Sequence, residues 1–285
     1  MTTRVYVFNT GDMTVSVIDA AADELVTTTF LGATASFPSN QFLPGMLTGA
    51  DDVMWLNIEQ GVQAVTAGSL SEVASLETGS GANWQEVTPD GEHLVVSARE
   101  PTHKQYRLDA TPGSDSFGEV TAELDRTDEE GRGDNDGPGP CDISIHPDGQ
   151  YAYIPDIFAD KLSVIDYERF EIVNQVPVDP VGDADNVSPW MDTVSWDGST
   201  LLVENNEGDT GTESIWDISD PAEPEEVARL TADDGLGELP LTSEIGPDSE
   251  TAYVFTANSE DVSVIDLTEN EVTGRIDLGG SAFVG

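Results

Sequence analysis

The hydrophobic and polar positions of this chain alternate in short runs, which indicates β-strands. The segment AYIPDIFADKLSVIDYERFEIVNQVPV (152–178) holds three such runs separated by polar turns, and AYVFTANSEDVSVIDLTENEVTGRIDL (252–278) repeats their order. A third copy, VYVFNTGDMTVSVIDAAADELVTTTFLG (5–32), lies near the start of the chain. Period-two runs bounded by turns predict antiparallel strands, and their recurrence predicts a repeat protein.

A fourth strand precedes the later copies and ends in a Pro-Asp turn, as in CDISIHPDGQ (141–150) and SEIGPDSE (243–250). Less regular copies fill the remaining chain: MLTGADDVMWLNIEQGVQAVTAGSLSEVASLE (46–77), NWQEVTPDGEHLVVSA (83–98) and MDTVSWDGSTLLVENN (191–206). Six units share the sequence, about 47 residues each, a length typical of propeller blades. Four short antiparallel strands per unit form the blade of a β-propeller.

The expected fold class is therefore all-β, a six-bladed β-propeller of four-stranded antiparallel blades in one domain, 1–285. The expected blades are 1–33 plus 279–285, 34–80, 81–133, 134–182, 183–236 and 237–278. The first unit lacks an innermost strand, and GGSAFVG (279–285) follows a finished sixth unit. We expect this C-terminal strand to complete the first blade, close the ring and remove two exposed edges.

The repeats resemble the YVTN family of β-propellers, which is typified by a Tyr-Val-Thr-Asn strand followed by a Val-Ser-Val-Ile-Asp strand. The first strand corresponds to 6–9, 153–156 and 253–256, and the second to 15–19, 162–166 and 262–266. IWDISDPAEPEEVARL (215–230) is similar to the related Leu-Val-Ile-Val-Asp repeat. The resemblance covers about half of the chain and implies the propeller fold. It leaves function open, because the family spans surface proteins, lactonases and propeller parts of redox enzymes.

Charge is the most unusual property of the composition. The chain has 56 Asp and Glu against 10 Lys and Arg, a formal net charge of −46, and the acids are spread along its whole length. Such a charge opposes compaction in dilute buffer and is screened in molar salt, so we interpret the protein as halophilic and haloarchaeal in character. An acidic tail would instead concentrate its charges in one run. The same charge excludes a broad basic surface for nucleic acid or for acidic membranes.

The sequence also bears on the compartment. The N-terminal MTTRVYVFNT enters a strand pattern without a signal-peptide profile, and no apolar run approaches membrane-spanning length. We therefore expect a cytoplasmic protein, and an extracellular protein whose leader was removed remains the alternative. Cys141 is the only cysteine, so the chain forms no internal disulfide.

Loop lengths predict which face of the propeller binds. The turns after the innermost strands are short, whereas GATASFPSNQFLPG, RTDEEGRGDNDGPGP, DPVGDADNVSP and TADDGLGELP are long connections on the opposite face, here called the upper face. Long loops on a rigid scaffold commonly carry function. Counting back from the turns places Trp84, Asp142, Trp190 and Asp192 at the upper mouth of the central channel, where a polar ligand could bind. The alternative is that both tryptophans pack between blades.

A basic segment is the second candidate feature. HLVVSAREPTHKQYR (93–107) includes Arg99, His103 and Lys104, which are expected on an upper loop and could hold an anionic group. Neutralisation of nearby acids such as Glu100 is the alternative.

Standard catalytic and metal motifs are missing from the sequence. It has no Gly-x-Ser-x-Gly elbow and no P-loop, and its three histidines are scattered. We expect no cofactor. Ca²⁺ bound to Asp128, Glu130, Asp134 and Asp136 is kept as an alternative, although their spacing differs from an EF-hand and a solvated loop explains them.

Two function classes follow from these patterns. The first is a scaffold that binds a protein or a small polar or anionic ligand through the upper face. The second is a propeller enzyme of the lactonase or dehydrogenase type, with Asp142 and Asp192 as the carboxylates at the channel mouth.

Overall fold

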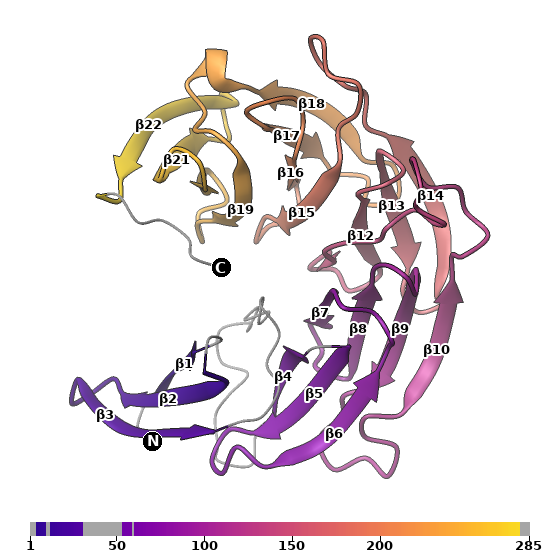
Figure 1. Ribbon diagram of the computed structural model, residues 1–285, viewed down its shortest axis with the longest axis vertical. Helices are drawn as coiled ribbons and strands as arrows, with labels where there is room; N and C mark the ends of the chain where they lie inside the picture. Colours follow the sequence, from indigo (N-terminus) through magenta and orange to yellow (C-terminus); the bar gives the residue numbers. More distant parts are fainter. Residues whose placement is uncertain (1–3, 10–11, 31–52, 59, 280–285) are drawn as a thin grey trace.

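The computed structural model describes residues 4–9, 12–30, 53–58 and 60–279, and it is a six-bladed β-propeller with almost no helix. Six antiparallel sheets follow one another around a common axis in chain order (Figure 1). The expected fold class is confirmed. The expected closing strand, 279–285, lies almost entirely outside the described residues.

The first two blades show three strands each within the described ranges. Blade 1 consists of β1 (Arg4–Asn9), β2 (Thr14–Asp19) and β3 (Glu24–Phe30), and blade 2 of β4 (Val53–Ile58), β5 (Gly61–Thr66) and β6 (Glu72–Glu77).

The other four blades have four strands each. Blade 3 has β7 (Asn83–Val87), β8 (His93–Ala98), β9 (Lys104–Asp109) and β10 (Val120–Asp125), and blade 4 has β11 (Ser144–Ile145), β12 (Tyr151–Asp156), β13 (Lys161–Asp166) and β14 (Glu171–Pro177). Blade 5 has β15 (Pro189–Val194), β16 (Thr200–Asn205), β17 (Thr212–Asp217) and β18 (Glu225–Leu230). Blade 6 has β19 (Pro240–Ile245), β20 (Thr251–Thr256), β21 (Asp261–Asp266) and β22 (Glu271–Asp277).

The hydrophobic core lies between neighbouring blades. One cluster joins blades 3 and 4 through residues such as Trp84, Val95 and Ile154, and another joins blades 4 and 5 through Leu162 and Trp216. Both faces of the middle strands in blades 4 and 5 are therefore buried, and β12, β13 and β16 have the same pattern of one half-buried and five buried residues. The ring is held together by side chains that interdigitate between sheets, as in other packed β-sheets.

Two local features recur from blade to blade. The residue just before the third strand of the repeat has a positive φ, as in Met13 (58°), His103 (49°), Asp160 (49°) and Glu260 (55°). The pairing of the third strand with the fourth also shifts register at the same place in all six blades of the described residues. Such bulges increase strand twist. The turn and the bulge thus belong to the repeat itself.

The upper connections are longer than the lower turns. The chain leaves β10 at Asp125 and reaches β11 at Ser144, and the connection before β19 contains the single-turn 3₁₀ helix η1 (Ala232–Asp234). Thr231 and Asp234 cap η1 reciprocally. Within the described ranges, no helix is long and apolar enough to cross a membrane.

Candidate ligand site on the inner strands of blades 3 to 5

Both predicted tryptophans lie between blades. Trp84, on β7, is 7% exposed and packs with Val95 of its own blade and Ile143 of blade 4. Trp190, on β15, is half-buried against the same cluster, and its indole N–H donates to the Pro240 carbonyl (3.2 Å). Each tryptophan therefore contributes to the contact between blades.

Arg99 lies directly above Trp84. The guanidinium carbon is 5.3 Å from the centre of the Trp84 ring, and the group also pairs with Glu100 (Nη2–Oε1 3.0 Å). The Cys141 thiol is 4.0 Å from Nη1. The Arg99 side chain keeps 24% of its surface exposed, so it is a cation at the upper rim that an anionic group can approach.

The other two predicted cations do not join Arg99. His103 is 3% exposed, and its Nδ1 accepts a hydrogen bond from the Gly139 N–H (3.2 Å). It occupies the positive-φ position that recurs in every blade, so the turn determines its place. The expectation that Lys104 lies in a loop is wrong, because Lys104 begins β9 and its ammonium points to the outer strand, where it pairs with Glu123 (2.6 Å) and Asp125 (3.0 Å).

The two predicted aspartates meet between blades 4 and 5, where Asp142 lies two residues before β11 and Asp192 lies on β15. Asp142 is 4% and Asp192 is 1% exposed. The Asp192 N–H donates to Asp142 Oδ2 (3.4 Å), and the Asp142 N–H donates to the Trp190 carbonyl (3.2 Å). The Ser144 hydroxyl beside them donates to the Asp192 backbone carbonyl (3.0 Å). Within the part of the chain that the structure describes, neither carboxylate oxygen of Asp192 has a hydrogen bond of ordinary geometry.

Sequence reasoning missed three further carboxylates beside this pair, the half-buried Glu86 and the buried Glu204 and Glu213. Glu86, on β7, accepts a hydrogen bond from the Ile145 N–H (2.5 Å), which ties blade 3 to blade 4. Glu204 and Glu213 face each other on β16 and β17, and both are completely buried. We use the name inner carboxylate cluster for Glu86, Asp142, Asp192, Glu204 and Glu213.

Burial favours the protonated form of these acids. It raises the pKa of Glu86 to about 8, against the opposing effect of the Ile145 N–H. It likewise raises the pKa of Asp142 to about 7 and the pKa of Glu204 to about 7. Burial and the negative charges of Asp142 and Glu204 raise the pKa of Asp192 well above its usual range. The cluster can therefore donate and accept hydrogen bonds near neutral pH.

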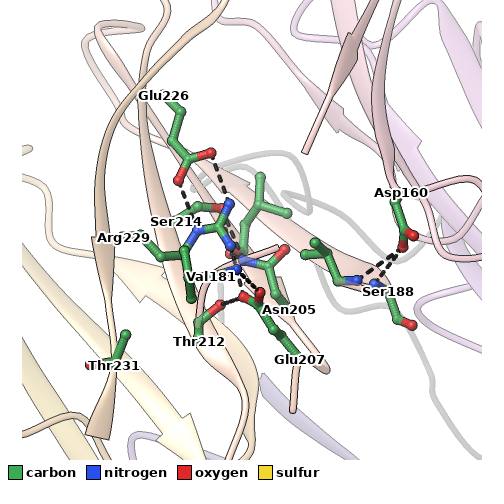
Figure 2. A network of polar contacts seen from close by, with 12 residues as sticks. Asp160, Val181, Ser188, Asn205, Glu207, Thr212, Ser214, Glu226, Arg229 and Thr231 are labelled. Carbon is green, nitrogen blue, oxygen red and sulfur yellow. Dashed lines mark hydrogen bonds and ion pairs between the residues drawn. The ribbon is translucent and has the colours of Figure 1, made fainter. Parts of the chain in front are cut away.

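The upper loops around the cluster are braced by ion pairs. Figure 2 shows Arg229 of β18 bound to Glu226 (Nε–Oε1 2.8 Å) and to Glu207 (Nη1–Oε2 2.8 Å), while Glu207 also accepts from the Val181 N–H and the Thr212 hydroxyl. Further along the same face, the Ser188 N–H donates to Asp160 (2.8 Å), which also pairs with Arg132. These contacts tie the upper connections to one another and to β18.

The structure gives no sign of a metal centre. In the described ranges, no three His, Cys, Asp or Glu side chains are arranged to hold a metal ion. The alternative of Ca²⁺ in the loop after β10 gains no geometric support from the described residues.

Comparisons with known proteins support the fold. No protein-family model and no curated protein matches the chain. A hydrazine synthase chain from Kuenenia stuttgartiensis superposes with a TM-score of 0.70 at 14% identity, covering 96% of this chain and 83% of that one. A candidate 6-phosphogluconolactonase from Bacteroides uniformis gives 0.69 at 14% identity (96% and 81% covered), and one from Bacteroides fragilis gives 0.68 at 16% identity (93% and 78% covered). At these identities the likeness shows the propeller fold alone.

Proposed function

We propose that this protein is a binding scaffold that takes a small polyhydroxylated ligand at the upper ends of the inner strands of blades 3 to 5. The observation that supports this is the meeting of Asp142 and Asp192 on adjacent blades, with the Asp192 carboxylate lacking a hydrogen-bond donor of ordinary geometry among the described residues. A buried acceptor without a donor costs free energy, and a ligand hydroxyl would supply that donor.

Arg99 extends the proposal to ligands that also carry an anionic group. Its guanidinium is partly exposed over Trp84, in the connection between β8 and β9. A carboxylate or phosphate could replace Glu100 as its partner, because an ion pair at this exposure is worth little. His103 and Lys104 are left out of the proposed site, since one is buried in a turn and the other is paired on the outer strand.

The test is isothermal titration of the protein in molar KCl with glucose and with gluconate. We expect Asp142→Asn and Asp192→Asn to weaken both ligands at least about tenfold, and Arg99→Ala to weaken only gluconate. Asp148→Asn and Asp197→Asn, in the lower turns, are the matched controls. The proposal is rejected if neither sugar binds, or if the lower-turn variants lose as much affinity as the upper ones.

A lactone hydrolase is the second candidate, and one observation favours it. Asp142 lies beside the Asp192 N–H between blades 4 and 5, and burial raises the pKa of its carboxyl to about 7, which suits the role of a general base for water. Incubation with δ-gluconolactone would separate the two functions. Hydrolysis above the spontaneous rate that disappears in Asp142→Asn indicates the enzyme, and binding without turnover indicates the scaffold.

A further inference from the structure

Glu204 and Glu213 form a buried acid pair between blades 5 and 6. They are directly opposite in the β16–β17 ladder, and both are 0% exposed. Because side chains alternate along a strand, the two acids share the face of Leu202 and Ile215. That face packs on blade 6 through residues such as Ile245. The acids therefore point into the contact between the two blades.

No positive partner neutralises this pair. Over the ranges that the structure describes, the four carboxylate oxygens of the pair have no hydrogen bond of ordinary geometry. Arg229 is the cation that acts on Glu213, but its guanidinium is already bound to Glu207 and Glu226. Ser243 of β19 lies against Glu204 and is itself 2% exposed, so it offers one hydroxyl to two acids.

The sister blades show that the fold does not need acids here. The same cross-strand position holds Phe255 and Val262 in blade 6, and Pro155 and Leu162 in blade 4. An apolar pair satisfies this site at no electrostatic cost, whereas two ionised carboxylates opposite each other repel strongly in a buried site. The two acids of blade 5 therefore need a positive species, a proton or a cation, that compensates for their charge.

We propose that Glu204 and Glu213 share a proton in the folded protein, and that losing this proton loosens the contact between blades 5 and 6. Two carboxyl groups that face each other without a cation cannot both ionise, and a shared proton gives them a mutual hydrogen bond. Because both side chains are 0% exposed, water cannot solvate a charge at this site, and a proton removes one of the two charges. This inference concerns the pair alone and does not depend on the proposed ligand.

The surrounding charges act mainly in the same direction. The groups that face the pair from other elements are Asp142 and Asp192 on the side of β11 and β15, Glu244 on β19 and Arg229 on β18. Among these charged groups Arg229 favours the ionised form of Glu213, and the Ser243 hydroxyl favours the ionised form of Glu204. Burial, followed by the charge of Glu204, raises the pKa of Glu213 well above its usual range.

The sign of the pH effect follows from these shifts. The relevant pH window lies between the ordinary pKa of a glutamate and the raised pKa of the pair in the folded protein. In this window the folded protein keeps the shared proton, whereas the unfolded chain has lost it. Folding then takes up a proton, so stability is greatest in mild acid and falls as the pH rises through about 7, the folded pKa of Glu204. The other members of the inner carboxylate cluster contribute a similar slope, so the pair must be isolated by difference.

The experiment compares melting temperatures at about pH 5.5 and pH 8.5 in molar KCl. We expect the wild-type melting temperature to fall by roughly 5 °C more than that of Glu213→Gln across this range. Glu213→Leu, which installs the residue of blade 4, should also melt higher than wild type at pH 8.5. Glu225→Gln is the matched control, because Glu225 also faces an acid, Asp217, in the same blade but on the exposed surface.

Infrared spectroscopy of the wild type gives a second measurement that requires no variant to fold. A protonated carboxyl band should persist at neutral pH and decrease toward pH 8.5. Equal pH slopes for wild type and Glu213→Gln, or the absence of that band, would overturn the proposal. An inorganic cation would be the occupant, instead of a proton, if exchanging KCl for choline chloride at pH 8.5 destabilised wild type but not Glu213→Gln.

Discussion

At the scale of single residues, Arg126 is a buried cation that neutralises two acids in this acidic protein. Its side chain is completely buried and forms two hydrogen bonds with Asp156 (both 2.7 Å), which is also completely buried. Its Nε donates to Glu129 (2.7 Å). The group fastens the long connection after β10 to blade 4, so the cation and the acids depend on each other.

We therefore predict that Arg126→Met lowers the free energy of unfolding by about 3–5 kcal/mol, because it leaves Asp156 charged or protonated without its partner. Adding Asp156→Leu should recover much of that loss. Arg169→Ala removes a largely exposed arginine that lies 3.6 Å from the buried Asp166, and it should cost at most about 1 kcal/mol because the exposed guanidinium is screened by solvent. Urea unfolding in molar KCl measures all three, and equal losses for Arg126→Met and Arg169→Ala would contradict the prediction.

Asp142 and Asp192 could be placed near the start of their inner strands because a Pro-Asp-Gly turn follows β11 and a Trp-Asp-Gly turn follows β15, and each turn fixes the count back along the chain. Glu204 and Glu213 were missed for a physical reason. Alternation of polar and apolar residues identifies the buried face of a strand when the other face is exposed to solvent. Both faces of these middle strands are buried between blades, so the alternation does not show which way a glutamate points. A comparison of the repeats, residue by residue, would have shown two acids where Phe255 and Val262 stand.

At the scale of elements, the lower turns are structural supports as well as connections. Gly198, in the turn between β15 and β16, has a φ of +72°, and a Cβ there would lie 2.6 Å from His146 Nε2 of blade 4. The same nitrogen is 2.9 Å from the Gly198 carbonyl oxygen. The turn of one blade thus rests on the turn of the previous one, which gives His146 a structural role.

Gly198→Ala should consequently destabilise the protein by more than Gly113→Ala. Both positions have a positive φ, +72° and +81°, so each alanine carries a strain of about 1–2 kcal/mol. No heavy atom lies within 4 Å of a Cβ at Gly113, whereas at Gly198 the His146 ring must move and its contact weakens. Differential scanning calorimetry in molar KCl would show the difference, and identical melting temperatures for the two variants would refute this view of the turn.

The strands themselves were largely predictable, since turn residues and alternation recur at a nearly constant spacing. The bulge in the pairing of the third and fourth strands was not. A bulge forms where one strand has an extra residue opposite its partner. The residue types at the bulge, such as Val164 and Ile165, are the same as those found in regular pairing, so the sequence does not mark it. Contacts between blades could not be predicted for a different reason. They join residues about 50 positions apart, such as Ser144 and Asp192, and the local pattern of the sequence does not show which residues meet.

At the scale of the whole molecule, the net charge of −46 leaves most acids without a protein cation. We predict that transfer from molar KCl to about 20 mM buffer unfolds the protein, because the Debye length grows from about 3 Å to more than 20 Å and repulsion reaches across the ring. Far-ultraviolet circular dichroism follows the loss of β-structure. Choline chloride at molar concentration should restore the fold as KCl does, since screening needs no particular cation, and an unchanged spectrum at low salt would disprove the halophilic interpretation.

The equivalence of blade positions also has an evolutionary consequence. A propeller that arose by duplication carries several copies of one framework, and the contact that Pro155 and Leu162 make in blade 4 remains in place whatever blade 5 acquires. One copy is then free to accumulate costly side chains while its neighbours preserve the ring. Blade 5, with its opposed Glu204 and Glu213, is a copy that carries such side chains.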